Sequence, residues 1–426
     1  MWANFLNIQG LPAAGAYFRG LPETDPQPQQ PRIYTRGFYQ LCTSTVLFMA
    51  SFGMIMPELP AHLEAMGGAE HIGLIIGVFT LAAFISRFFS GRIADLAGRK
   101  KVMIIGTIVT AAAGFGYLVA VGITSFFVLR FLHGFSTGFR PTGTTAMLAD
   151  IIPKSRRGEA LGYLGIAGNT GMAAGPVLGS YLAVEFGMDA MFIMSSVLGI
   201  LSLWITFKLP ESLPNPRKVS LGDLNIFKGG IIDVKAWPAA LFLLPVAFAF
   251  GVFLTITPDF VEHLGYVYKG SFNTIMISSA IAMRVFAGRA SDRYGRQPLL
   301  FFGAILLCAG MWLLSVAETK AMASVGGVVY GLSIGINMPT IFAWTADLAS
   351  RGKVAMALGT MLMALEIGIG WGAIQSGLVY AGDVANISRL YAYCSWFAAI
   401  SSGGLAFAWI KMNRREGKKV DGLGGE

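Results

Sequence analysis

The chain has 426 residues, of which 54% are hydrophobic and only 13% are charged. A soluble protein of this length needs a charged exterior that 32 Lys+Arg and 23 Asp+Glu would cover thinly, so the composition argues for a membrane protein. The formal net charge of +9 does not indicate nucleic-acid binding, because the basic residues recur between alternate apolar runs and form no single patch.

Residues 1–36 are predicted to form a polar cytoplasmic tail. They include several prolines between Pro22 and Pro31 and lack the apolar core and cleavage site of a signal peptide. The cysteines of the chain are far apart and lie in apolar runs, so they predict neither a disulfide framework nor a metal site. They are Cys42, Cys308 and Cys394.

Twelve apolar runs follow, each long enough to cross a bilayer at about 20 residues or more. Six of them lie within residues 37–208 and six within 237–411, separated by a polar, proline-containing linker at 209–236. Lys and Arg gather in alternate loops, which is the positive-inside pattern of a chain with both termini in the cytoplasm. Residues 412–426 are then a cytoplasmic tail. The expected spans are 37–60, 70–91, 102–121, 124–148, 159–184, 187–208, 237–261, 270–290, 298–317, 320–345, 354–380 and 386–411.

The two sets of six spans are predicted to be repeats, because the chain matches itself at a fixed offset of 284 − 87 = 197 residues. The offset joins the second span to the eighth, so both halves face the same way across the membrane. The fold class is therefore an all-α membrane protein of twelve transmembrane helices in two parallel six-helix repeats, with a cavity between them. Matching pairs include Arg87 and Arg284, Asp95 and Asp292, Asp150 and Asp347, and Gly171 and Gly368.

Two of the matching segments are loops with a shared pattern. The first reads GRIADLAGRKK from Gly91 to Lys101, and its copy reads GRASDRYGR from Gly288 to Arg296. The pattern resembles the cytoplasmic loop signature of the major facilitator superfamily. The resemblance implies the twelve-helix fold and the transport of a small solute by alternating access.

The residues of these loops are predicted to gate the cytoplasmic face. Glycine permits a tight turn, aspartate accepts hydrogen bonds, and arginine can clamp a carboxylate on a neighbouring helix. The alternative is that the charges only set topology, although the positive-inside rule does not require the aspartate that both copies carry. The gating candidates here are Gly91, Gly98, Asp95, Arg99, Asp292 and Arg296.

The fifth span carries the sequence GMAAGPVLG from Gly171 to Gly179. Glycines four residues apart let a neighbouring helix approach closely, and Pro176 is expected to bend the wall of the cavity. The segment resembles the signature on helix five of the proton-coupled antiporter branch, which implies export and makes Gly171, Gly175 and Pro176 gating candidates. Ordinary small-residue packing is the alternative.

The fourth span contains Arg130 and His133 within the sequence LRFLHG. This is similar to the family's Arg-x-x-Gln-Gly pattern, with histidine in place of glutamine, and the resemblance implies a role for Arg130 in proton transfer. An arginine inside a span usually faces a cavity or an acid. His133 could titrate near neutral pH or could only hydrogen-bond a neighbour.

Glu366 is the first candidate for proton coupling. It lies near the middle of the eleventh span with no Lys or Arg within two turns of its own helix, and burial disfavours its charged form. The alternative is a structural Glu366 paired with Arg140 of the fourth span. Glu58 and Asp259, each following a proline at the outer end of the first span of its half, are further candidates for coupling.

Four residues are predicted to contact substrate. Asn169 is the repeat mate of Glu366, and Arg140, whose repeat mate is Asn337, breaks the symmetry between the halves. Arg87 and Arg284 are instead expected to extend to the membrane interface. The substrate-binding candidates are Arg140, Asn169, Asn337 and Gln375.

No Walker-type loop, nucleophile elbow or metal motif occurs, so the sequence predicts no enzyme, no cofactor and no ATP-driven pump. The expected partners are a small, amphipathic solute, protons and the lipid bilayer, without nucleic acid, and the expected state is a monomer in the cell (inner) membrane. The favoured hypothesis is a proton-coupled exporter. A proton-coupled or facilitative importer and a receptor or scaffold that does not transport remain as alternatives.

Overall fold

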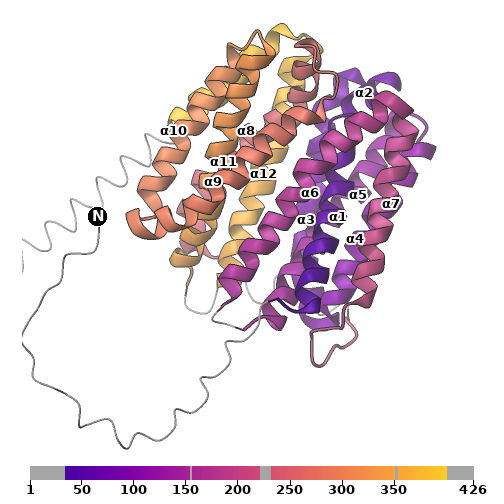
Figure 1. Cartoon of the computed structure of the whole chain (residues 1–426), viewed down its shortest axis with the longest axis vertical. Helices are drawn as coiled ribbons and strands as arrows, with labels where there is room; N and C mark the ends of the chain where they lie inside the picture. The colour runs from indigo at the N-terminus through magenta and orange to yellow at the C-terminus, as the bar shows by residue number, and fades with distance from the viewer. Residues whose placement is uncertain (1–33, 154–155, 221–231, 351–353, 401–426) are drawn as a thin grey trace, which may run out of the picture.

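The computed structural model describes residues 34–153, 156–220, 232–350 and 354–400, and the regular structure in these ranges is helical. The two tails expected at residues 1–36 and 412–426 fall almost entirely outside the described residues, as does part of the linker. Figure 1 shows the first half of the chain, in indigo to magenta, beside the second half, in orange to yellow.

Each half is a bundle of long helices that run across the same layer (Figure 1). The helices of the first half are α1 (Arg36–Ile55), the short α2 (Leu59–Ala65), α3 (Ile72–Ala97), α4 (Arg99–Val119), α5 (Ile123–Ile151), α6 (Arg157–Phe186) and α7 (Met188–Lys208). Those of the second half are α8 (Trp237–His263), α9 (Gly270–Tyr294), α10 (Arg296–Ser315), α11 (Lys320–Leu348) and α12 (Val354–Tyr380), followed by helical residues 385–400.

By length and composition, 8 of the described helical segments are long and apolar enough to cross a membrane. The helices α5, α6 and α9 are as long but are less apolar or more charged along their length. The twelfth expected span continues beyond residue 400, outside the described residues. Within the described residues, the helices therefore occupy the positions of the expected spans, the twelfth of them up to residue 400.

Small residues let helices within a half pack closely. A methyl group added at Gly171, Gly175 or Gly179 of α6 would overlap backbone atoms of α1. In the second half, Gly368 and Gly372 of α12 pack in the same way against α8. The glycine-rich segment of α6 thus makes the close small-residue packing expected in membrane bundles.

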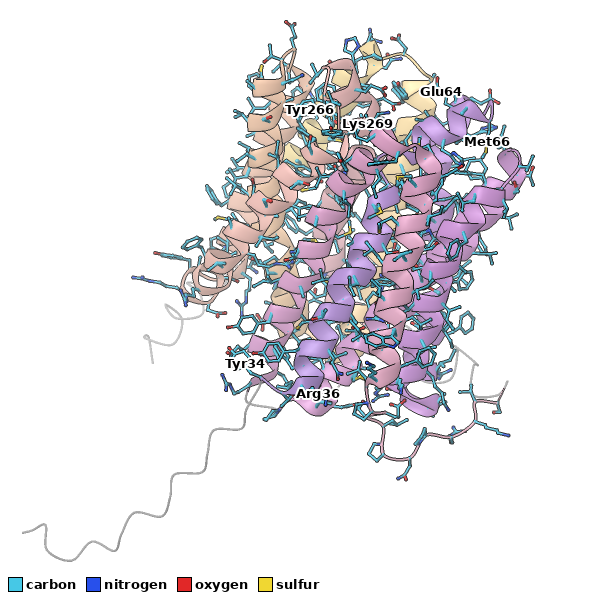
Figure 2. All side chains as sticks on the ribbon, turned by 45° about the vertical axis from the view of Figure 1, so that its right-hand side comes forward. Tyr34, Arg36, Glu64, Met66, Tyr266 and Lys269 are labelled. Carbon is cyan, nitrogen blue, oxygen red and sulfur yellow. The ribbon has the colours of Figure 1, made fainter. Side chains whose placement is uncertain are left out.

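The two ends of the molecule differ in how the halves meet. Figure 2 shows Arg36 at one end of the molecule and Glu64 and Lys269 at the other. We call the end with Arg36 the basic end and the opposite end the far end. The helix order also puts Arg99 and Arg296, the first residues of α4 and α10, at the basic end. The halves contact each other through α3 with α12 and through α6 with α9.

At the far end both helix pairs are in close contact. An added methyl carbon at Gly73 of α3 would lie 2.6 Å from the carbonyl oxygen of Ala373 of α12, and one at Gly270 of α9 would overlap the carbonyl of Pro176 of α6. At the basic end of the same four helices, two repeat-related pairs of glycines have no described atom within 4 Å of such a carbon. The structure is thus closed at the far end. These four glycines are Gly91, Gly162, Gly288 and Gly359.

Candidate solute cavity and gates

A cavity of about 330 Å³ lies between the halves. It is lined by α1, α3, α5 and α6 of the first half and by α8, α9, α11 and α12 of the second, which is the repeat-related set of helices. Most of the lining side chains are apolar, and the size and composition suit a small amphipathic molecule. The polar lining residues are Thr80, Thr137, Asn169, Asn273, Arg284 and Glu366.

Glu366 on α12 forms an ion pair with Arg87 on α3 at the wall of this cavity. One carboxylate oxygen, Oε1, accepts hydrogen bonds from Arg87 Nε at 3.0 Å and from Nη2 at 2.6 Å. The Glu366 side chain is only 8% exposed and that of Arg87 is 19% exposed, so the pair is largely shielded from water. Because the partners belong to different halves, the pair joins α3 to α12.

This pair corrects two sequence-based expectations. Arg87 does not extend to the membrane interface, and the partner of Glu366 is not Arg140. The physical reason is that a carboxylate 279 residues away in the chain lies within reach of Arg87, and a paired guanidinium is more favourable there than an isolated one. Arg284, the repeat mate of Arg87, lines the cavity.

Arg140 is buried inside the first half and does not line the cavity. Its guanidinium donates hydrogen bonds to Thr107 Oγ1 at 2.6 Å, to Thr206 Oγ1 at 2.8 Å and to Ser44 Oγ at 2.8 Å. The predicted substrate contact of Arg140 is therefore wrong for this conformation, because the guanidinium is buried and both of its terminal nitrogens bind hydroxyl groups of α1, α4 and α7, while Nε has no partner among the described residues.

The other predicted substrate contacts divide in the same way. Asn169 of α6 lines the cavity. Asn337 is buried within α11, donates to Ser333 Oγ at 3.0 Å and packs against Gly303 of α10, while Gln375 is exposed on the outer surface of α12. Asn337 and Gln375 therefore make no contact with a molecule in this cavity.

Arg130 and His133 lie behind the aromatic wall of the cavity. Arg130 donates to the carbonyl of Ile75 at 3.0 Å, and its guanidinium carbon lies 4.6 Å from the ring centroid of Phe79, which lines the cavity. The ring nitrogens of His133 are buried, with no hydrogen-bond partner among the described residues. The proton-transfer role of Arg130 stays a prediction.

A chain of hydrogen bonds crosses between the halves at the far end. Buried Glu58 accepts a hydrogen bond from Ser180 Oγ of α6 at 2.5 Å. Ser180 Oγ in turn accepts a hydrogen bond from the backbone N–H of Gly270 of α9 at 2.8 Å. Thr274 Oγ1 donates to the carbonyl of Ala173 at 2.6 Å beside it. The sequence predicts a functional role for Glu58 but not for Ser180, whose hydroxyl connects this acid to the other half.

Two further contacts complete the far end. The Tyr268 hydroxyl donates to Glu185 Oε1 at 2.9 Å, and this hydrogen bond raises the pKa of Tyr268 above its ordinary value. Asp259 of α8 is hydrogen-bonded to Tyr380 of α12, so its partner lies within the second half. The coupling roles of Glu58 and Asp259 stay predictions.

At the basic end the two loop motifs form matching ion-pair clusters. Arg99 contacts Asp95 at 2.7 Å and Asp150 of α5 at 3.1 Å. Arg296 contacts Asp292 at 2.5 Å and Asp347 of α11 at 2.9 Å. The segments expected to be loops are mostly helical, since α3 runs to Ala97 and α9 to Tyr294 and a single glycine separates each from the next helix. Each cluster ties such a helix junction to a third helix of the same half, and a gating function for either remains a prediction.

Glu211, which the sequence did not single out, caps α4 from the linker. Its carboxylate accepts the backbone N–H groups of Arg99 at 2.9 Å and Lys100 at 3.2 Å, at the positive end of the helix dipole. The preceding Gly98 has φ +121, and a methyl group there would overlap the Glu211 carboxylate. The glycine therefore serves both the turn and the cap.

Replacing Gly98 with Ala is expected to lower stability more than the same change at Gly295. Both glycines have positive φ, so each variant strains the backbone by about 1–3 kcal/mol. Only at Gly98 does the methyl group also displace the Glu211 cap, which adds about 1 kcal/mol. Thermal unfolding of the two purified variants in one detergent measures the difference, and equal losses would contradict the capping role of Glu211.

Comparison with known proteins agrees with this architecture. The Major Facilitator Superfamily profile matches residues 41–373. An uncharacterized MFS-type transporter of Methanocaldococcus jannaschii is 25% identical over 385 residues, which cover 86% of this chain and 96% of that protein. Multidrug resistance protein 1 of Bacillus subtilis is 26% identical over 384 residues, covering 87% and 95%.

A solved structure of the peptide transporter POT shares the fold. It matches with a TM-score of 0.72 at 13% sequence identity, covering 89% of this chain and 95% of that one. The family profile spans most of the chain, and the helices have the arrangement that the profile implies. The chain therefore belongs to the Major Facilitator Superfamily and is a multi-pass membrane transporter of small molecules, not an enzyme.

Proposed function

We propose that this transporter exports a small amphipathic solute in exchange for protons. The observation that carries the proposal is the ion pair between Glu366 and Arg87, because it places a titratable carboxylate both on the cavity wall and across the contact between the halves. Among the described residues that line the cavity, Glu366 is the only acid. A proton taken up there changes the contact that joins α3 to α12.

The charge of Glu366 links proton binding to the arrangement of the halves. While the carboxylate is ionised, its bond to Arg87 favours the conformation in which α3 and α12 lie together. Protonation removes the charge that balances Arg87 and weakens this contact, so the alternative arrangement becomes more populated. A ligand that binds one arrangement better than the other shifts the same equilibrium, which is how solute and proton become coupled.

Orientation and relatives support export. If the basic end faces the cytoplasm, as the positive-inside pattern predicts, the far end is external and the structure is closed to the outside. Such a conformation is ready to receive solute from the cytoplasm. The relative from Bacillus subtilis is named a multidrug resistance protein, which agrees with export through the cell (inner) membrane.

Proton movement in inverted membrane vesicles tests the proposal. Candidate solutes come from a susceptibility screen of a strain that lacks the gene, and vesicles without the protein are the control. With an acidic lumen, addition of a transported solute is expected to make the lumen more alkaline. Solute-triggered acidification would support symport instead. Solute entry without proton movement would support a facilitative carrier, and the absence of both solute and proton movement with every solute of the screen would support a receptor or scaffold.

A further inference from the structure

Arg284 of α9 is an arginine on the cavity wall that has no counter-ion among the described residues. It lines the cavity, and no described side chain or carbonyl forms a hydrogen bond or ion pair with it. Three other arginines that lie within long helices have partners: Arg87 binds Glu366, while Arg130 and Arg140 donate hydrogen bonds to carbonyl and hydroxyl oxygens. The positive charge of Arg284 is thus unbalanced within the protein.

The internal repeat explains why the acid is missing. Arg284 is the repeat mate of Arg87, and the repeat mate of Glu366 is Asn169 on α6. Where α3 contacts α12, an arginine meets a carboxylate. Where α9 contacts α6, the arginine is present as Arg284, but the amide of Asn169 takes the place of the carboxylate. A methyl carbon added at Gly165, one turn before Asn169, would lie 3.2 Å from Arg284 Nη1, so the guanidinium reaches α6 at this level.

The balance of charges in and beside the cavity favours an anion. Glu366, the one acid among the described lining residues, is already paired with Arg87, which leaves the positive charge of Arg284 in excess on the cavity wall. An unpaired charge in apolar surroundings is costly, and a bound anion removes that cost. A cationic molecule would instead meet a like charge, which disfavours its binding.

We infer that Arg284 binds the anionic group of the transported solute, and that the cavity therefore takes an amphipathic organic anion. The inference rests on the proposed transport function and specifies its substrate class. The carboxylate or sulfonate of the solute pairs with Arg284 beside Asn169. Its apolar body lies against side chains such as Phe79, Met172 and Ile277, which line the same cavity.

Two probes of one skeleton and opposite charge test this inference. The purified full-length protein in neutral detergent is titrated with 2-naphthoate and with 2-naphthylmethylammonium, and binding is followed by the rise in thermal midpoint and by naphthalene fluorescence. We expect 2-naphthoate to bind and the cation to bind far more weakly. Arg284→Gln is expected to weaken 2-naphthoate binding by about tenfold to hundredfold, the effect of losing a charged hydrogen-bond donor.

Two variants control for non-specific effects. Arg289→Gln removes an exposed arginine from the same helix and should leave 2-naphthoate binding unchanged. Asn169→Asp supplies the carboxylate that the repeat lacks, so it should occupy Arg284 from within, raise the thermal midpoint without ligand and abolish the response to 2-naphthoate. The two effects of Asn169→Asp in opposite directions distinguish occupation of Arg284 from a damaged fold.

The inference is overturned if the cation stabilises the protein as well as the anion does, if Arg284→Gln binds 2-naphthoate normally, or if neither this nor a naphthalene sulfonate binds at all. These measurements need no proton gradient. A protein that binds only the cation would therefore leave proton-coupled export standing, whereas failure of the vesicle assay would leave the anion site standing.

Discussion

Replacing Glu366 with Gln is expected to abolish proton-driven accumulation of solute while leaving downhill exchange intact. Glutamine keeps the size of the side chain and an oxygen that can accept from Arg87, but it cannot release or take up a proton in the working range. A pH difference of one unit supports about tenfold accumulation for each proton exchanged, roughly 1.4 kcal/mol. The variant should lose this whole factor, because the only described acid on the cavity wall is gone.

The measurement compares uphill accumulation with solute counterflow in the same vesicles. Glu159→Gln is the matched control, since Glu159 is an acid that pairs with Arg156 at the basic end, away from the cavity. Accumulation by the Glu366 variant against a gradient, with an unchanged pH profile, would show that coupling resides elsewhere, with Glu58 and Asp259 as the next acids to test.

Replacing Gly270 with Val is expected to open the far end and to stop transport. The position has no room for a side chain, because even a methyl group would overlap the carbonyl of Pro176. These are backbone atoms on facing helices, so the overlap can be relieved only by separating α9 from α6. Overpacking of this kind costs about 1–3 kcal/mol, which shifts a two-state equilibrium by roughly fivefold to more than a hundredfold.

Cysteine labelling measures that shift. In a background without the native cysteines, Asn273→Cys places a thiol on the cavity wall, and a membrane-impermeant maleimide is applied from each side. Gly270→Val should raise labelling from the far end and lower solute exchange. Gly288→Val on the same helix is the control, because its site is open and far-end labelling should stay low. Equal far-end labelling in both variants would contradict the role of Gly270 in closure.

The sequence was sufficient for the architecture, because hydropathy and charge alternation are local properties of the chain. The positions of the long helices and the matching of Asp95 with Asp292 and Arg99 with Arg296 follow from such local patterns. The repeat offset adds the symmetry between the halves. These features depend little on how each helix is rotated about its axis.

The cavity was harder to predict, because its lining depends on helix rotation and on pairing between distant segments. The position of Arg140 within a span indicates a functional residue, yet its terminal nitrogens bind hydroxyl groups on three other helices, away from the cavity. The position of Arg87 near the end of its own span indicates the interface, whereas its partner Glu366 lies on a helix of the other half. The repeat offset relates Arg87 to Arg284 and Glu366 to Asn169, but only the contact between Arg87 and Glu366, 279 residues apart in the chain, shows that Arg284 lacks the matching acid.

The four open glycines at the basic end have a consequence for the other conformation. The helix pairs that are in contact at the far end through Gly73 and Gly270 also have small residues at their opposite ends, the tips, where an added methyl carbon would have no described atom within 4 Å. A rocking movement that parts the far end can bring these tips together without rebuilding any helix. Bulky side chains there should therefore leave the conformation described here unchanged and destabilise only the conformation that is closed at the basic end. The transporter would then bind solute but could not complete its transport cycle. The tips concerned are those at Gly91, Gly162, Gly288 and Gly359.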